Sequence, residues 1–139
     1  MKNKLLFLIF AIACIFFHAC NFIQQQKIVG KWSISSIEFP PIGSKNGSIE
    51  KIDSLSIEFF NDGSFNVETK TRDDKKLFVA ALMSNIIHPN GKYEFNKDGM
   101  GLLLDSLTYS IEKITSDSLI LKSSNYPFTG ATIRCSKLD

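Results

Sequence analysis

Side chains able to carry out acid–base, nucleophilic or metal chemistry are scattered through this 139-residue sequence. His88 has no partner near it in sequence at the spacing of a metal site or of a catalytic histidine and its base. It precedes Pro89 at the expected end of a helix, which favours a capping or exposed position. The sequence therefore predicts no metal site and no histidine-based catalysis.

The acidic residues that could suggest a site also have structural explanations. Asp73 and Asp74 precede an apolar segment, and adjacent acids stabilise the start of a helix through its dipole. Asp62 and Asp98 each precede a glycine, which is the pattern of a tight turn, whereas a calcium loop needs several acids in register. No Gly-x-Ser-x-Gly nucleophile elbow appears. We therefore expect a protein that is not an enzyme and needs no cofactor.

The composition is typical of one globular domain and argues against disorder. Hydrophobic residues make up 44% of the chain and charged residues 22%, and 12 phenylalanines could fill a compact core. Lys2 and Lys4 lie at the N-terminus, and the remaining 14 basic residues balance the 14 acidic ones. A neutral domain has neither the basic footprint of a nucleic-acid-binding protein nor a polybasic patch for anionic lipids.

The N-terminus has the three parts of a secretory signal. Lys2 and Lys4 are followed by an unbroken apolar run at 5–17 and then by His18-Ala19-Cys20. The run is shorter than the roughly 20 apolar residues that span a bilayer comfortably. We expect a lipoprotein signal peptide at 1–19, a glutamine-rich tether at 20–27 and one domain at 28–139.

A small residue before a cysteine at the end of an apolar run resembles the bacterial lipobox. The resemblance implies that Cys20 carries a diacylglycerol and, often, a further acyl chain such as palmitate, which together hold a protein stably at a bilayer. Phe17 stands where lipoboxes usually have Leu, Val or Ile, as in relaxed lipoboxes of Bacteroidetes-type bacteria. Cys14 after Ala13 is an alternative lipidation site. A third possibility is a chain without a lipid, either secreted or anchored by an uncut signal helix. By the same resemblance, Asn21 favours the outer membrane, facing the periplasm.

Cys135 is the one cysteine left if Cys14 is removed and Cys20 is lipidated, so no internal disulfide is expected. It alternates with Arg134 and Ser136 near the C-terminus. This favours a small buried apolar residue over a reactive thiol.

Alternating apolar and polar residues predict a chain made mostly of strands. Tight turns are expected at 61–63 and 97–99, and a loop at 42–52. One amphipathic helix is expected at 73–87, where apolar residues recur at helical spacing. The expected strands lie at 28–39, 55–59, 65–68, 92–96, 101–105, 107–114, 119–123 and 131–137. About eight strands with short connections predict an all-β antiparallel meander that closes into a small barrel, with one inserted helix.

Four segments resemble the lipocalin-like lipoproteins of Bacteroidetes-type bacteria. They are Gly30-Lys31-Trp32, the hairpin at 59–65, the Gly-Lys-Tyr-Glu-Phe strand at 91–95 and the strand–turn–strand unit at 109–121. The resemblance implies an eight-stranded barrel with Trp32 at its closed end. It also implies a basic residue on the last strand that packs across the ring, for which Arg134 is the candidate. This chain is shorter than typical lipocalins, and its helix lies in the middle of the sequence.

Inward aromatic side chains could line a cavity for an apolar ligand or could fill the barrel. The candidate ligand-binding residues are Phe59, Phe65, Tyr93, Phe95 and Tyr109. One hypothesis is therefore a membrane-anchored binding module for a small apolar molecule, with the helix as lid or plug. The other is an envelope interaction protein with a filled barrel, which docks a protein partner through its surface or its helix.

Overall fold

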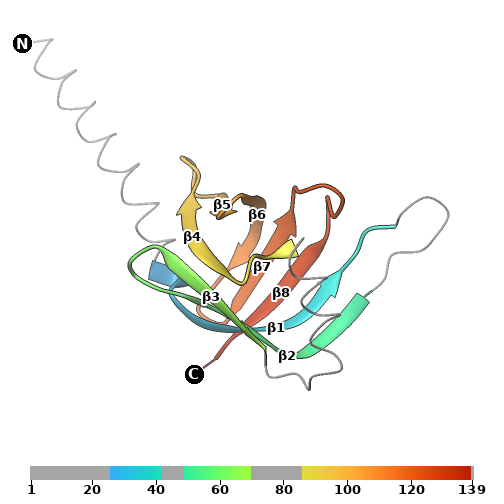
Figure 1. Cartoon of the computed structure of the whole chain (residues 1–139), viewed down its shortest axis with the longest axis horizontal. Helices are drawn as coiled ribbons and strands as arrows, with labels where there is room; N and C mark the ends of the chain where they lie inside the picture. The colour runs from blue at the N-terminus through green and yellow to red at the C-terminus, as the bar shows by residue number, and fades with distance from the viewer. Residues whose placement is uncertain (1–25, 42–48, 70–85, 139) are drawn as a thin grey trace, which may run out of the picture.

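Eight antiparallel strands form a closed barrel in the computed structural model, which describes residues 26–41, 49–69 and 86–138 (Figure 1). The strands are β1 (Gly30–Glu38), β2 (Ile49–Phe59), β3 (Ser64–Thr69), β4 (Asn90–Phe95), β5 (Gly101–Leu104), β6 (Leu107–Ile114), β7 (Ser118–Ser123) and β8 (Thr132–Lys137). Each strand pairs with the next, and β8 pairs with β1. The expected all-β barrel is confirmed.

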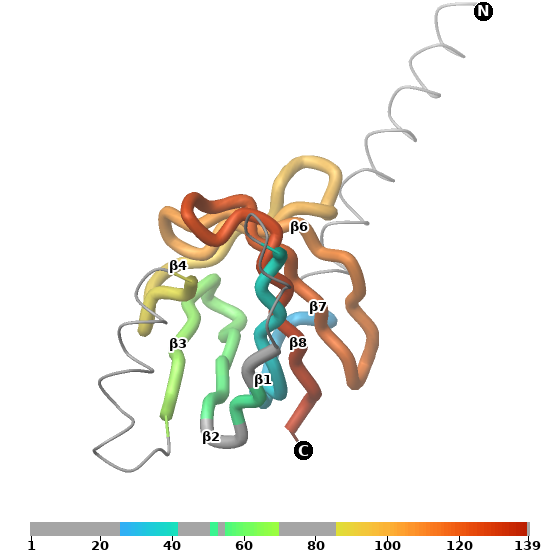
Figure 2. The backbone as a smooth tube through the Cα atoms, turned by 90° about the vertical axis from the view of Figure 1, so that its right-hand side faces the viewer, coloured from blue at the N-terminus to red at the C-terminus, as the bar shows by residue number. Residues whose placement is uncertain are grey.

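The order of the strands gives the barrel two distinct ends. The base holds the start of β1, the end of β8 and the turns β2–β3, β4–β5 and β6–β7. The mouth holds the ends of β1, β3, β5 and β7 and the starts of the strands that follow them. Figure 2 shows the strands following one another around the barrel. Every strand pair and every buried core residue lies between Ile28 and Lys137, so this part of the chain contains the whole described barrel.

The turn between β2 and β3 follows directly from its residue types. Asp62 accepts hydrogen bonds from the Ser64 amide at 2.9 Å and from the Ser64 hydroxyl. Gly63 has a φ of +78°, which a glycine adopts without the strain that a Cβ would cause. These bonds hold the pairing of Phe59 with Phe65 in register.

Residue alternation decides which side chains enter the barrel, because successive side chains of a strand point to opposite faces. On β6, Tyr109 and Ile111 are buried, whereas Thr108, Ser110 and Glu112 are exposed. The same rule holds on β7, where Leu119 and Leu121 are buried. The described core is therefore formed almost entirely by the inward face of the sheet.

The structure corrects the expected loop at 42–52 and describes only the end of the helix expected at 73–87. The loop expected at 42–52 is wrong at its end, because β2 begins at Ile49 and its first residues pair with the end of β1. A register shift between Ile34 and Ser36 of β1 accompanies this pairing. Most of the helix expected at 73–87 lies outside the described residues; at its end Ile86 is helical, and Ile86 and Ile87 are buried.

The proposed signal peptide and most of the tether also lie outside the described residues. At the end of the tether, residues 26–28 are helical, and Ile28 is fully buried. Among the described helical residues, none belongs to a helix with the length and apolar character needed to cross a bilayer.

Candidate ligand site inside the barrel

The base of the barrel is closed by Trp32, which is fully buried. Its indole Nε1 donates a hydrogen bond of 2.7 Å to the carbonyl of Ile28. The ammonium Nζ of Lys137 lies 4.4 Å from the centroid of the indole ring and donates a hydrogen bond to the carbonyl of Val29. A cation this close to the ring face is attracted by its π electrons. Burial lowers the pKa of Lys137 below its usual value.

Gly30 is required at the base for two reasons. Its φ is +116°, a conformation that side chains rarely adopt. A Cβ built on this residue would also lie 2.8 Å from Nζ of Lys137. The glycine of the Gly-x-Trp segment therefore leaves room for the lysine that covers the tryptophan.

The prediction that Arg134 packs across Trp32 is wrong. On β8, Ile133 and Cys135 point inward, so Arg134 between them points outward, where it pairs with Glu38 through bonds of 2.7 and 3.2 Å. Lys137 follows Cys135 by two residues and therefore shares the inward face, directly opposite Trp32 in the register of β1 and β8. The alternation counted from the buried cysteine is the signal in the sequence that could have identified Lys137.

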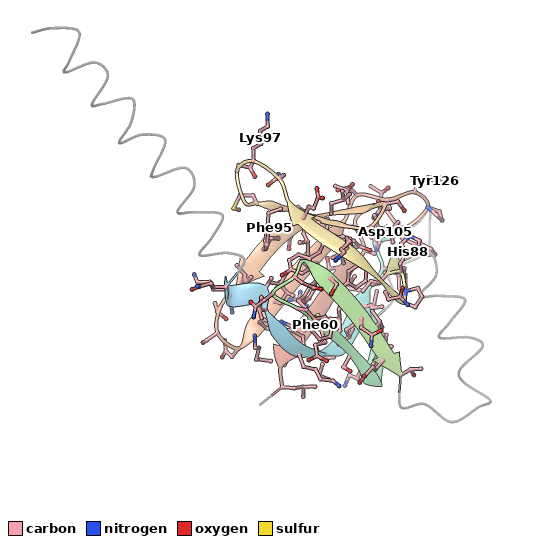
Figure 3. All side chains as sticks on the ribbon, turned by 60° about the vertical axis from the view of Figure 1, so that its left-hand side comes forward. Phe60, His88, Phe95, Lys97, Asp105 and Tyr126 are labelled. Atoms are coloured by element: carbon pink, nitrogen blue, oxygen red, sulfur yellow. The ribbon has the colours of Figure 1, made fainter. Side chains whose placement is uncertain are left out.

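Four of the five candidate ligand residues form one packed group near the base. The rings of Phe59 and Tyr93 meet edge to face at 5.2 Å, those of Tyr93 and Phe95 at 6.2 Å, and those of Phe59 and Phe65 at 6.3 Å. The hydroxyl of Tyr93 donates a 2.8 Å hydrogen bond to the carbonyl of Phe60 in the β2–β3 turn. Phe95 is half-buried and labelled in Figure 3. These rings therefore pack against one another and fill the interior near the base.

Tyr109 lies apart from this group, on the inward face of β6 between Leu102 of β5 and Ser123 of β7. Its side chain is 1% exposed, and its hydroxyl is the one buried side-chain polar atom of the described residues without a hydrogen-bond partner. Burial raises the pKa of this phenol well above its usual value, so the group is a neutral donor. The hydroxyl group of Ser123 accepts hydrogen bonds from the amide and the side chain of Asn125 at 3.1 Å.

The mouth is crossed by the chain that leads into β4. Ile86 and Ile87 are buried in the core, and His88 bonds to the hydroxyl of Ser106 in the β5–β6 turn through Nε2 at 3.1 Å. Figure 3 shows His88 beside this turn, on the side away from Lys97 of the base. At the same end, the rings of Phe39 and Phe128 lie 5.8 Å apart. Apolar side chains therefore cover the interior at the mouth.

A separate pocket of about 280 Å³ lies on the outer surface of β4, β5 and β6. Its lining includes the outward residues of these strands together with backbone and neighbouring side chains. The lining residues are Glu94, Phe95, Asn96, Gly101, Leu102, Leu103 and Thr108.

Comparison with solved structures supports the fold. A crystal structure of a lipocalin-like protein from Bacteroides uniformis superimposes with a TM-score of 0.54 over 81% of this chain and 99% of that chain, at 19% sequence identity. A likeness at this identity shows a lipocalin-like fold. No family model matches the sequence, and no curated protein matches it.

Proposed function

We propose that this protein is a lipid-anchored protein of the bacterial cell envelope whose barrel binds a small apolar molecule. The observation that carries the proposal is the construction of the barrel. Its wall is closed, most of its described inward side chains are apolar, and its base is sealed by Trp32 and Lys137. At the mouth, by contrast, the described residues Ile86 and Ile87, which precede β4, are buried in the core without belonging to a strand. Ligand sites of small barrels lie in such a mouth.

The segment at Ile86 and Ile87 is the part that would have to move to admit a ligand. Its buried side chains compete with the ligand for the same apolar space. The bond between the exposed side chains of His88 and Ser106 holds the end of this segment to the rim. Such a bond contributes only about 1 kcal/mol, whereas burial of each isoleucine contributes about 1.5–3 kcal/mol, so a ligand has to replace their apolar contacts when the mouth opens.

Two neighbouring leucines on β5 provide a matched test of where a ligand binds. Leu104 is fully buried and points inward, whereas Leu103 is 37% exposed and points outward. The chain from Asn21 onward contains every described strand and is titrated with the fluorescent probe N-phenyl-1-naphthylamine. The emission of Trp32, the single tryptophan, reports on the interior.

We expect one probe per chain in the unmodified protein, weaker binding in Leu104→Phe and unchanged binding in Leu103→Phe. The added ring occupies interior space only in the first variant. Melting curves confirm that both variants are folded. Absence of binding in the unmodified protein, or an equal effect of both substitutions, would contradict an interior site.

Cys20 is the proposed attachment point for the lipid. The described chain begins at Gln26, next to Ile28 beneath Trp32, so an anchor a few residues earlier would turn the base toward the membrane and the mouth away from it. Labelling cells with an alkyne analogue of palmitate tests the site. Cys20→Ser is expected to abolish labelling, whereas Cys14→Ser should leave it intact; the reverse result would move the anchor to Cys14. Protease treatment of intact cells tests the proposed periplasmic orientation, in which the chain is protected.

The outer pocket on β4, β5 and β6 favours a second candidate function, in which the barrel docks a protein of the envelope. Leu103 is exposed in this pocket next to Thr108 and Glu94, a mixture of apolar and polar groups that is typical of a small contact surface. Crosslinking in cells from a photoreactive residue in place of Thr108, an exposed residue of the same pocket lining, tests it. A discrete crosslinked protein, lost in Leu103→Asp but not in Leu104→Phe, would support this function.

A further inference from the structure

Among the described residues, one fully buried side-chain oxygen has no hydrogen-bond partner. This oxygen is the hydroxyl of Tyr109. The indole of Trp32 has the carbonyl of Ile28, the hydroxyl of Tyr93 has the carbonyl of Phe60, and the hydroxyl of Ser123 has Asn125. Because an unpaired buried hydroxyl costs free energy, such an exception calls for a function.

Tyr109 lies in the half of β6 that is nearer the mouth. Tyr109 follows the β5–β6 turn by three residues, and its partner across the ladder, Ser123, ends β7 at the same end of the barrel. Asn125 holds the next loop against β6, since its side chain bonds both the amide and the carbonyl of Thr108 at 2.9 and 3.0 Å. The wall around Tyr109 is therefore fixed, and its phenol is buried on the inward face of β6.

We propose that the hydroxyl of Tyr109 donates a hydrogen bond to the ligand, and that the ligand is an apolar molecule with a neutral carbonyl-type oxygen. This inference rests on the proposed interior site and names the chemistry that the site selects. A ketone or ester oxygen accepts the bond that no described residue accepts. The neighbouring inward side chains, Leu102 and Leu104, contact the hydrocarbon part of the ligand.

A neutral acceptor fits better than a carboxylate because of the charges in the interior. Lys137 is the one cationic side chain that the described strands turn inward, and it lies at the base over Trp32 with its own carbonyl partner. A carboxylate beside Tyr109 would lose its hydration without a cation to replace it, which is costly in an apolar site. The ketone loses little hydration and gains one bond.

The test compares ligands of equal length. Binding of 2-nonanone, nonane and nonanoate to the chain from Asn21 onward is measured by competition with N-phenyl-1-naphthylamine. We expect the ketone to bind about 5- to 10-fold more tightly than the alkane, the value of one buried hydrogen bond, and nonanoate to bind more weakly than the ketone. Tyr109→Phe should remove the preference for the ketone and leave alkane binding unchanged.

The outcomes separate this inference from the proposed function. If nonane and 2-nonanone bind equally well to the unmodified protein, or if the preference survives in Tyr109→Phe, the role of the hydroxyl is refuted while the interior site stands. Tighter binding of nonanoate refutes the neutral ligand class. If none of the three displaces the probe, or the probe itself does not bind, both proposals fail.

A second measurement needs no ligand and uses Tyr93 as the matched control. Tyr93→Phe removes a hydroxyl with a partner and should lower the melting temperature by roughly 4 °C. Tyr109→Phe removes a hydroxyl without one and should leave the melting temperature unchanged or raise it. Equal destabilisation by both substitutions would mean that the hydroxyl of Tyr109 is already bonded in the free protein, which would refute the inference.

Discussion

Replacing Lys137 by methionine tests how the base of the barrel is held together. The change keeps most of the side-chain stem and removes the ammonium over Trp32 and its bond to the carbonyl of Val29. The cation–π contact contributes about 1 kcal/mol and the charge-assisted hydrogen bond about 1.5–3 kcal/mol. Burial of the charge, which lowers the pKa of Lys137, offsets part of this. We expect a net loss of about 2 kcal/mol and a fall of roughly 8 °C in melting temperature, followed by circular dichroism at pH 7.

Arg134→Met on the same strand is the matched control. The ion pair of Arg134 with Glu38 lies on the outer face, where the two side chains are 44% and 33% exposed. Pairs of this kind contribute about 0–1 kcal/mol, so the melting temperature should fall by no more than about 4 °C and less at high salt. The emission of Trp32 should change in Lys137→Met alone. If Arg134→Met destabilises the protein as much as Lys137→Met does, the assignment of the base to Lys137 is refuted.

Three further predictions concern other parts of the barrel. Because burial raises the pKa of the Cys135 thiol to about 12, the folded protein should not react with Ellman's reagent at pH 8, whereas one thiol should react after unfolding of the chain from Asn21 onward. Asn125→Ala should destabilise the protein by about 1–2 kcal/mol and speed hydrogen exchange at the amide of Thr108, whose bond to the Asn125 side chain it loses. The hydroxyl and amide of Ser64 hold the pKa of the Asp62 carboxyl below its usual value. The contribution of this carboxylate to stability is therefore complete above the unfolded pKa near 4 and is lost as the pH falls through the lower folded value. Asp62→Asn should flatten the acid side of a curve of stability against pH.

The strands and their inward faces could be predicted from the sequence because each strand carries its own period of two. β6 is observed at Leu107–Ile114, as expected, and Tyr109 and Ile111 point inward. The start of β2 at Ile49 could not be predicted in this way. Its pairing with β1 depends on backbone hydrogen bonds that any residue can make, and polar residues near the mouth give no alternation to detect.

The error at Arg134 shows how a family resemblance can override a local rule. The resemblance implies a basic residue on the last strand, and Arg134 is the arginine of that strand. Cys135 was also predicted to be buried, and adjacent strand residues cannot both point inward. Consistent use of the alternation selects Lys137, which the structure places over Trp32. The resemblance identified the type of residue, and the period of the strand identifies the position.

The difference between Tyr93 and Tyr109 lies beyond any such pattern. Both tyrosines occupy inward positions on strands with clear alternation, and both are almost completely buried. The hydroxyl of Tyr93 donates a hydrogen bond to the carbonyl of Phe60, because the β2–β3 turn lies next to it. The hydroxyl of Tyr109 has no partner among the described residues. A hydrogen bond to a backbone carbonyl depends on the spatial path of the chain and leaves no trace in residue types. For this reason a sequence can list the inward tyrosines, but only the structure distinguishes Tyr93, whose hydroxyl is bonded, from Tyr109, whose hydroxyl has no partner among the described residues.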